Sequence, residues 1–269
     1  MCLLALCAVV SCVGLASHGL TNWQEAMRAL VARTMGLGDD GAPGGPAEWI
    51  VPTINGEPYL AKPPMIYWCQ LGLARIRAAV GGDGVPTLFD LRLTVALAGT
   101  LGVLATYAVA RRLFGATPHE RASVPATALT RDAFASHVAW WSSLFLATGF
   151  LYVRSSRTGE LDILLAPATV VAIGAIFGAW RRHEDGGRTH WAALAVAGLA
   201  VAAAALTKGP PGIVTIFLAA YGGIALSIAS ALRDDRAGSS RSALVGGILC
   251  AFAIVVPALL NIEKPSDVL

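Results

Sequence analysis

The sequence has few charged residues. Only 14% of its 269 residues are Asp, Glu, Lys or Arg, whereas 55% are hydrophobic and the mean hydropathy is +0.63. A soluble domain carries about 25% charged residues, so this composition excludes an ordinary soluble protein and indicates a membrane protein. The net charge of +3 is too small to predict a nucleic-acid partner.

Cysteine and histidine are scarce and show no pattern. The five cysteines lack C-x-x-C or metal-finger spacing, and the five histidines are scattered along the chain. We therefore expect no disulfide and no metal bound by cysteine or histidine. A divalent metal held by carboxylates stays open, and the sequence indicates no other cofactor.

Apolar residues collect in seven blocks, each near the length that crosses about 30 Å of hydrocarbon as a helix. The blocks are residues 1–17, 91–110, 138–153, 161–180, 191–207, 211–232 and 242–262. A helix satisfies its own backbone where lipid offers no partner. The predicted fold is therefore an all-α, polytopic helical membrane protein with about seven spans. The first block could instead be a signal peptide, but no basic residues precede it.

The arginines predict the orientation of the chain. They cluster after the second, fourth and sixth blocks, and such clusters mark cytoplasmic connections. The long connection 18–90 and Lys208 are then expected on the outer side. The segment Met65 to Val80 is apolar, but it reaches only about 24 Å and carries two arginines. We interpret it as an interfacial helix, because counting it as a span would place every arginine cluster outside.

A second interfacial helix is predicted in the same loop, from Thr21 to Met35. Its apolar residues at helical spacing are Met27, Leu30, Val31 and Met35. Arg28 and Arg33 are expected on other faces.

The predicted spans contain almost no ionisable side chains, which argues against an ion-coupled transporter. Cations and carboxylates gather instead on the predicted outer side: Glu25, Glu57, Lys62, Arg92, Arg154, Arg157, Glu160, Asp162 and Lys208. Such a cluster at a membrane surface suits a lipid-linked phosphate held beside a reacting group.

The stretch from Trp49 to Trp68 reads WIVPTINGEPYLAKPPMIYW. Its four prolines suppress helix, and Gly56 permits a tight turn after Asn55, so we expect a defined extended loop that holds Lys62 at the interface. Together with RSSRTGELDILLA and ALTKGP further along the chain, this stretch resembles the GT-C membrane glycosyltransferases of the lipid A aminoarabinose transferase and protein O-mannosyltransferase type.

The resemblance implies transfer of a sugar from a polyprenyl-phosphate donor to a lipid, glycan or protein acceptor, on the outer side of the cytoplasmic (inner) membrane. On matching positions it implies that Lys62, Lys208 and Arg92 hold the donor phosphate and that Asp162 lines the catalytic cavity. Further candidates for the phosphate are Arg154 and Arg157. Candidates for the donor or acceptor pocket are Gln24, Tyr59 and Tyr67.

Transfer to a hydroxyl needs a base for the proton and cations for the charge on the departing phosphate. Family members usually carry an Asp-Glu pair in the first loop, where this chain has Gln24 and Glu25. We therefore predict Glu25 as the base. Glu25 also fits a helix-capping box with Asn22.

Other structural roles stay open at this point. Asp162 could cap the fourth helix, and the two site lysines could anchor their segments at the membrane surface. The substitution at Gln24 and the short chain leave a second hypothesis, a non-catalytic membrane module that binds lipid-linked sugar or a partner. Family members are usually much longer, so we expect residues 1–269 to form the N-terminal part of one GT-C-like domain.

Overall fold

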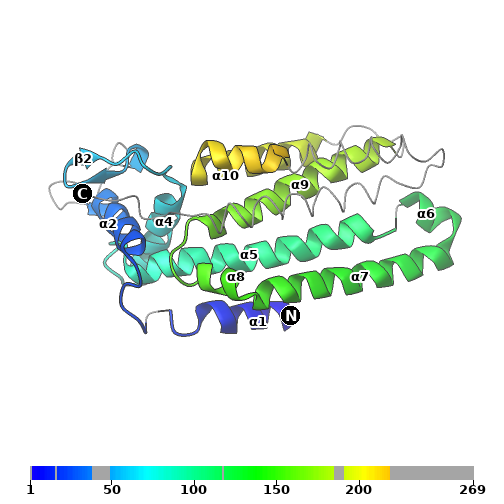
Figure 1. Cartoon of the computed structure of the whole chain (residues 1–269), viewed down its shortest axis with the longest axis horizontal. Coiled ribbons are helices and arrows are strands. Elements are labelled where there is room, and N and C mark those ends of the chain that lie inside the picture. The colour runs from blue at the N-terminus through cyan, green and yellow to red at the C-terminus, as the bar shows by residue number, and fades with distance from the viewer. Residues whose placement is uncertain (1, 16, 38–48, 117, 185–190, 219–269) are drawn as a thin grey trace.

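The computed structural model describes residues 2–15, 17–37, 49–116, 118–184 and 191–218. Its long helices lie side by side in an elongated bundle, and the elements of the first loop gather at one end (Figure 1). The chain is therefore an all-α, helical membrane protein, as the sequence predicts. The seventh predicted span, part of the sixth and residues 39–48 of the first loop lie outside the described residues.

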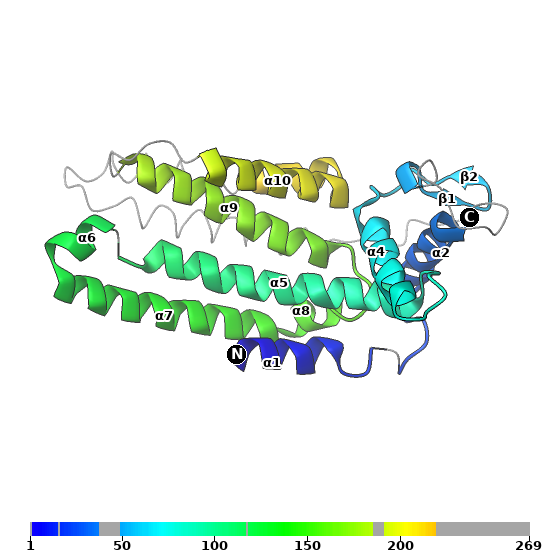
Figure 2. The same cartoon turned by 180° about the vertical axis from the view of Figure 1, so that it is seen from behind.

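Three described helices are long and apolar enough to cross a membrane: α5 (Leu88–Phe114), α9 (Asp162–Glu184) and α10 (Trp191–Lys208). They contain the second, fourth and fifth predicted blocks. α5 packs between α9 and α7 (Pro125–Thr148), and α10 packs on α9. The bundle thus brings the first residue of α9 and the last residue of α10 to the end where the loop elements lie (Figure 2).

Two predicted spans differ from the structure. The third, residues 138–153, is not one helix, because Gly149 adopts an extended conformation (φ −62°, ψ 123°) that ends α7 before the short α8 (Phe150–Ser155). The first is also shorter than its apolar block. α1 (Cys2–Cys7) continues as one π-helical segment (Ala8–Cys12), and these eleven residues reach only about 16 Å.

α4 (Met65–Ala79) is the predicted interfacial helix, and it packs on α2 (Trp23–Leu37) and on the start of α5. Thr87 and Asp90 form a capping box at the start of α5, in which the Asp90 carboxylate accepts from the Thr87 backbone N–H at 2.8 Å. Arg77 of α4 donates to the same carboxylate at 3.1 Å. This contact joins the loop to the bundle.

α2 forms where the sequence predicts a helix, and Val31 and Met35 of the predicted apolar face are buried, but two other residues differ from the prediction. Leu30 is exposed, whereas Arg28 is buried. Hydrophobic periodicity cannot anticipate this, because the buried charge of Arg28 is compensated by groups from a distant part of the chain.

The proline-rich stretch forms a small hairpin of β1 (Thr53–Ile54) and β2 (Glu57–Pro58), which pair antiparallel. Asn55 and Gly56 both have positive φ, 54° and 79°, which confirms the predicted tight turn. Residues 51–64 contain no helix, as the prolines predict, whereas the last four residues of the stretch, Met65 to Trp68, belong to α4.

The loop and the bundle share one hydrophobic core. Val31 of α2, Tyr67 of α4 and Leu91 of α5 are fully buried in it, together with Leu164 of α9. Trp49, Tyr59 and Trp68 pack against the same core. The loop is thus packed directly onto the ends of α5 and α9, and this packing positions the polar residues described next.

Candidate functional site

The end of α10 meets the start of α9 through an ion pair between Lys208 and Asp162. The Asp162 carboxylate is buried, whereas 23% of the Lys208 side chain is exposed. α10 ends at Lys208 because Gly209 has a left-handed backbone (φ 67°), which favours glycine. Asp162 occupies the positive end of α9, so the position that the sequence allowed for a helix-capping role also holds the lysine.

The segment that carries Lys62 lies beside this ion pair. A Cβ placed on Gly209 would lie 3.9 Å from Cγ of Pro63. Because Pro63 follows Lys62 and Gly209 follows Lys208, the two lysine segments are neighbours in the fold. The Lys62 side chain itself is half-buried. The structure therefore brings together the two segments that the sequence assigns to the donor phosphate.

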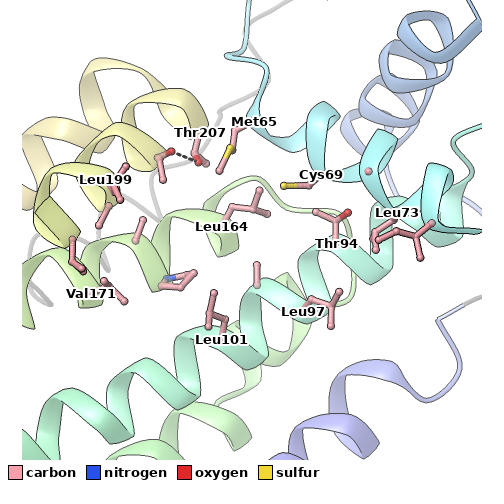
Figure 3. Close-up of a pocket in the computed structure, with 18 residues that line it drawn as sticks. Met65, Cys69, Leu73, Thr94, Leu97, Leu101, Leu164, Val171, Leu199 and Thr207 are labelled. Atoms are coloured by element: carbon pink, nitrogen blue, oxygen red, sulfur yellow. Dashed lines mark hydrogen bonds between the residues drawn. The ribbon is translucent and has the colours of Figure 1, made fainter. Parts of the chain in front are cut away.

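An apolar groove of about 640 Å³ begins beside these segments and runs between α4, α5, α9 and α10. Figure 3 shows several of the side chains that line it. They include Met65, Cys69, Leu97, Leu164, Leu199 and Thr207. Met65 lies three residues after Lys62, and Thr207 directly precedes Lys208. One end of the apolar groove therefore lies next to both lysine segments.

Glu25 and Arg92 form a buried ion pair between α2 and α5. Nε of Arg92 donates to Oε1 of Glu25 at 2.8 Å, and Nη2 donates to Oε2 at 3.1 Å. The backbone N–H and the hydroxyl of Thr21 also donate to Oε2, each at 2.8 Å. Burial raises the pKa of the Glu25 carboxyl, but the hydrogen bonds from Arg92 and Thr21 outweigh it and lower the pKa below its ordinary value.

Arg92 uses its remaining donors on backbone carbonyls. Nη1 donates to Leu15 and His18, and Nη2 donates to Gly19, at 2.6 to 2.7 Å. With the two bonds to Glu25, all five N–H groups of the guanidinium are used within the protein. The residue fastens the N-terminal connection to α2 and α5, and this arrangement leaves no N–H for a donor phosphate.

The two remaining arginines predicted to bind phosphate are Arg154, in the last turn of α8, and Arg157, just after that helix. Arg157 donates to the carbonyls of Val10 and Val13, at 2.7 and 2.8 Å, and so holds the N-terminal segment against the bundle. Arg154 is exposed. The structure does not pair either side chain with Lys62, Lys208 or Asp162.

A second charged cluster joins α2 to the turn before α9. Arg28 donates to the Gly159 carbonyl at 2.7 Å and to the side-chain oxygen of Gln24 at 3.0 Å. It also forms an ion pair with Glu160 at 3.5 Å. Gly159 has φ 67°, and a Cβ there would meet Leu91 at 3.0 Å, so the turn needs glycine both for its backbone and for its close packing.

Of the two predicted pocket tyrosines, Tyr59 packs against the hydrophobic core and Tyr67 interacts electrostatically with Arg28. Tyr67 is fully buried, and its hydroxyl has no hydrogen-bond partner among the described residues. Burial raises the pKa of Tyr67, and the neighbouring Tyr59 raises it further, whereas the charge of Arg28 opposes the change. Tyr67 is therefore neutral, and it lies close enough to Arg28 for the two side chains to interact electrostatically.

Sequence analysis did not assign a site role to Arg28 or to Glu160. Neither side chain stands out locally, because the two meet across 131 to 132 positions of the chain. The only available signal was their position beside assigned residues, in the helix of Gln24 and in the RTGELD segment of Asp162. The described residues contain no group of three His, Cys, Asp or Glu side chains able to hold a metal ion.

Comparison with known proteins finds a matching family model, two solved structures of similar fold and a protein of similar sequence. Residues 121–264 match the family model of dolichyl-phosphate-mannose-protein mannosyltransferases. Crystal structures of ArnT from Cupriavidus metallidurans, in the apo state and bound to undecaprenyl phosphate, share the fold with a TM-score of 0.62 and 22% identity. An uncharacterized protein of Aquifex aeolicus (strain VF5) is 29% identical over 168 residues.

These relatives are longer than this chain. The ArnT matches cover 98% of this chain but 42% of ArnT, and the Aquifex match covers 62% of this chain and 27% of that protein. The chain therefore spans less than half the length of either. The family match nevertheless extends over more than half of the chain and confirms the resemblance that the loop and lysine motifs indicate: this chain belongs to the dolichyl-phosphate-mannose-protein mannosyltransferase family.

Proposed function

We propose that the whole protein transfers a sugar from a polyprenyl-phosphate donor to a hydroxyl of a lipid, glycan or protein acceptor. The reaction takes place on the outer side of the cytoplasmic membrane. The observation that carries the proposal is that the Lys62 and Lys208 segments are neighbours, and that Met65 and Thr207, close to these lysines in the sequence, line an apolar groove. A donor of this class has two complementary parts: an anionic phosphate that suits the lysines and a long apolar chain that suits the groove.

The charges of the site match those of the donor. Lys62, Lys208 and Asp162 together carry a formal charge of +1, and the phosphodiester of a lipid-linked sugar carries −1. After transfer the departing polyprenyl phosphate becomes more negative, approaching about −1.5 to −2 at neutral pH. The lysines therefore stabilise the charge that grows as the sugar leaves, which is where cations accelerate the reaction. Asp162 orients Lys208 for this role.

The groove accounts for the lipid part of the donor. Its volume of about 640 Å³ lies within the range of small-molecule sites, about 300–1,000 Å³, and its wall is almost entirely apolar. Burying prenyl groups there is worth about 25 cal/mol for each Å² removed from water, although a donor already in the membrane gains less. ArnT, which shares this fold, has been crystallised with undecaprenyl phosphate.

The contacts of Glu25 and Arg92 fit a positioning role for this pair. Both carboxylate oxygens are occupied, and the lowered pKa makes Glu25 a weaker proton acceptor than an ordinary glutamate. Arg92 likewise has no N–H left for a phosphate, because Glu25 and three backbone carbonyls accept all five. We therefore assign this pair to holding α2 and the N-terminal connection against the site.

The lysine roles are tested with the complete gene product in nanodiscs, using undecaprenyl phosphate as the probe. Lys62→Ala and Lys208→Ala are each expected to weaken binding about tenfold or more, which corresponds to about 1.4 kcal/mol. Arg33→Ala is the matched control, because Arg33 is exposed on α2 and away from the site. If both lysine variants bind the probe and transfer sugar like the wild type, the proposal is wrong.

One observation favours a second candidate function. Gln24 stands where family members usually carry an aspartate, and an amide cannot act as a base. Its side-chain oxygen accepts a hydrogen bond from Arg28. A protein that binds lipid-linked sugar without transferring it would show undecaprenyl-phosphate affinity but no turnover. A gain of transfer in Gln24→Asp would then identify the chain as a degenerate enzyme.

A further inference from the structure

Glutamate 160 is a carboxylate that the predicted chemistry leaves unused. It lies in the turn between α8 and α9, two residues before Asp162. Because two residues span at most about 7 Å, its backbone lies within that distance of the residue that holds Lys208. Its side chain is 23% exposed, whereas that of Glu25 is fully buried. Glu160 thus combines closeness to the cationic end of the groove with access from outside.

The other described carboxylates at this end of the bundle, except Glu57, already have hydrogen-bond or ion-pair partners. Glu25 is held by Arg92 and Thr21, and Asp162 is paired with Lys208. Asp90 accepts from Thr87 and Arg77, and Asp83 accepts from Arg77 and from the Val85 backbone. Glu57 is exposed on the hairpin.

Arg28 holds the Glu160 carboxylate less tightly than Arg92 holds Glu25. Among the described residues the Glu160 carboxylate pairs with Arg28 at 3.5 Å, a looser contact than the 2.8 Å bond between Arg92 and Glu25. Arg28 is itself fixed by the Gly159 carbonyl and by Gln24. The guanidinium therefore orients the carboxylate without occupying both of its oxygens. The same guanidinium joins Glu160 to Gln24, the position where relatives usually have an aspartate.

We propose that Glu160 is the general base of the transfer, in place of an acidic residue at position 24. This inference rests on the proposed function. The acceptor hydroxyl oxygen attacks the anomeric carbon of the sugar, and its proton passes to the Glu160 carboxylate. The bond between the anomeric carbon and the phosphate oxygen breaks, and its electron pair leaves with the polyprenyl phosphate. The proton on Glu160 then returns to water.

The experiment uses the complete gene product in nanodiscs with undecaprenyl-phosphate mannose as donor and 1-octanol as hydroxyl acceptor. Glu160→Ala is expected to lower transfer by about 10²- to 10⁴-fold, the usual contribution of a general base. Its affinity for undecaprenyl phosphate is expected to stay within about twofold of the wild type, because the lysines are untouched. Glu57→Ala is the matched control and is expected to retain full transfer.

Sodium azide separates a base from a structural residue. Azide is an anionic nucleophile that needs no deprotonation and is small enough for the space that the truncated side chain leaves. It is expected to restore donor turnover in Glu160→Ala, with mannosyl azide as product, and not in Asp162→Ala. The conservative variant Glu160→Gln keeps an oxygen for Arg28, so it is expected to fold and to lose transfer equally.

Three outcomes would overturn the assignment: transfer by Glu160→Ala within tenfold of the wild type, no rescue by azide, or equal rescue of Asp162→Ala. The failure of the proposed function gives a different result. In that case the wild-type protein itself neither binds undecaprenyl phosphate nor consumes the donor.

Discussion

Replacing Glu25 with glutamine is expected to destabilise the protein, not merely to slow its reaction. The carboxylate accepts four hydrogen bonds, two from Arg92 and two from Thr21, and it is fully buried. Glutamine removes the negative charge and brings an amide N–H₂ group toward donors that need an acceptor. The guanidinium of Arg92 is then left as a buried charge without its counter-ion.

The magnitude follows from these contacts. Removing one partner of a buried ion pair costs about 3–5 kcal/mol, because the other charge stays desolvated and unpaired. Arg92→Met is expected to cost at least as much, since it also leaves the carbonyls of Leu15, His18 and Gly19 without their donor. Because the two residues contact each other, the double variant should lose about 0.5–3 kcal/mol less than the sum of the single variants.

Thermal unfolding of the purified protein in detergent measures this effect. A loss of about 3–5 kcal/mol corresponds to a fall in melting temperature of roughly 6–20 °C for a chain of this size. Glu57→Gln is the control, because an exposed glutamate should change stability by no more than about 0.5 kcal/mol. Transfer activity is measured on the same samples, below the melting temperature of each variant.

The opposite pattern would refute the reasoning. If Glu25→Gln melts like the wild type while transfer falls by about 10²-fold or more, then the carboxylate acts as the base that the sequence predicts. The buried ion pair would then be a feature of the protein without substrate, and Arg92 would be available to other partners.

Two further predictions follow from the same structure. Hydrogen bonds lower the pKa of Glu25, so its contribution to stability should be complete above the unfolded value of about 4.3 and disappear as the pH falls through the lower folded value. The difference in melting temperature between wild type and Glu25→Gln should therefore shrink only below about pH 4.3. A difference that vanishes near pH 6 would contradict the lowered pKa. Gly102→Ala should cost about 1–3 kcal/mol, because its Cβ would overlap the Tyr152 hydroxyl that donates to a carbonyl of α5, whereas Gly72→Ala has open space and should not lower the melting temperature.

Local features of the sequence are enough to predict three of the long helices of the bundle. Apolar block length predicts α5, α9 and α10, and the charge-poor composition predicts a membrane protein. Local patterns also predict α2, α4 and the turn at Asn55 and Gly56. The break at Gly149 was missed, because a glycine within an apolar block is compatible with both a continuous and an interrupted helix.

The two lysine segments were found by their motifs, but the tertiary structure alone shows that Pro63 and Gly209 are neighbours. It alone also shows that Lys208 pairs with Asp162, because these residues belong to different helices. A motif identifies the residue types that suit a phosphate. Their convergence depends on how α4, α9 and α10 pack, which no single segment contains.

The charged residues of the loop illustrate the same division. The sequence shows that Glu25, Arg28 and Arg92 are charged, but it does not show which of these charges is buried or which partner it has. Glu25 and Arg92 are 67 positions apart, and Arg28 reaches a carbonyl 131 positions away. A buried charge is tolerated only where another group compensates it. The tertiary structure therefore decides which carboxylate is buried in an ion pair and which stays accessible to solvent.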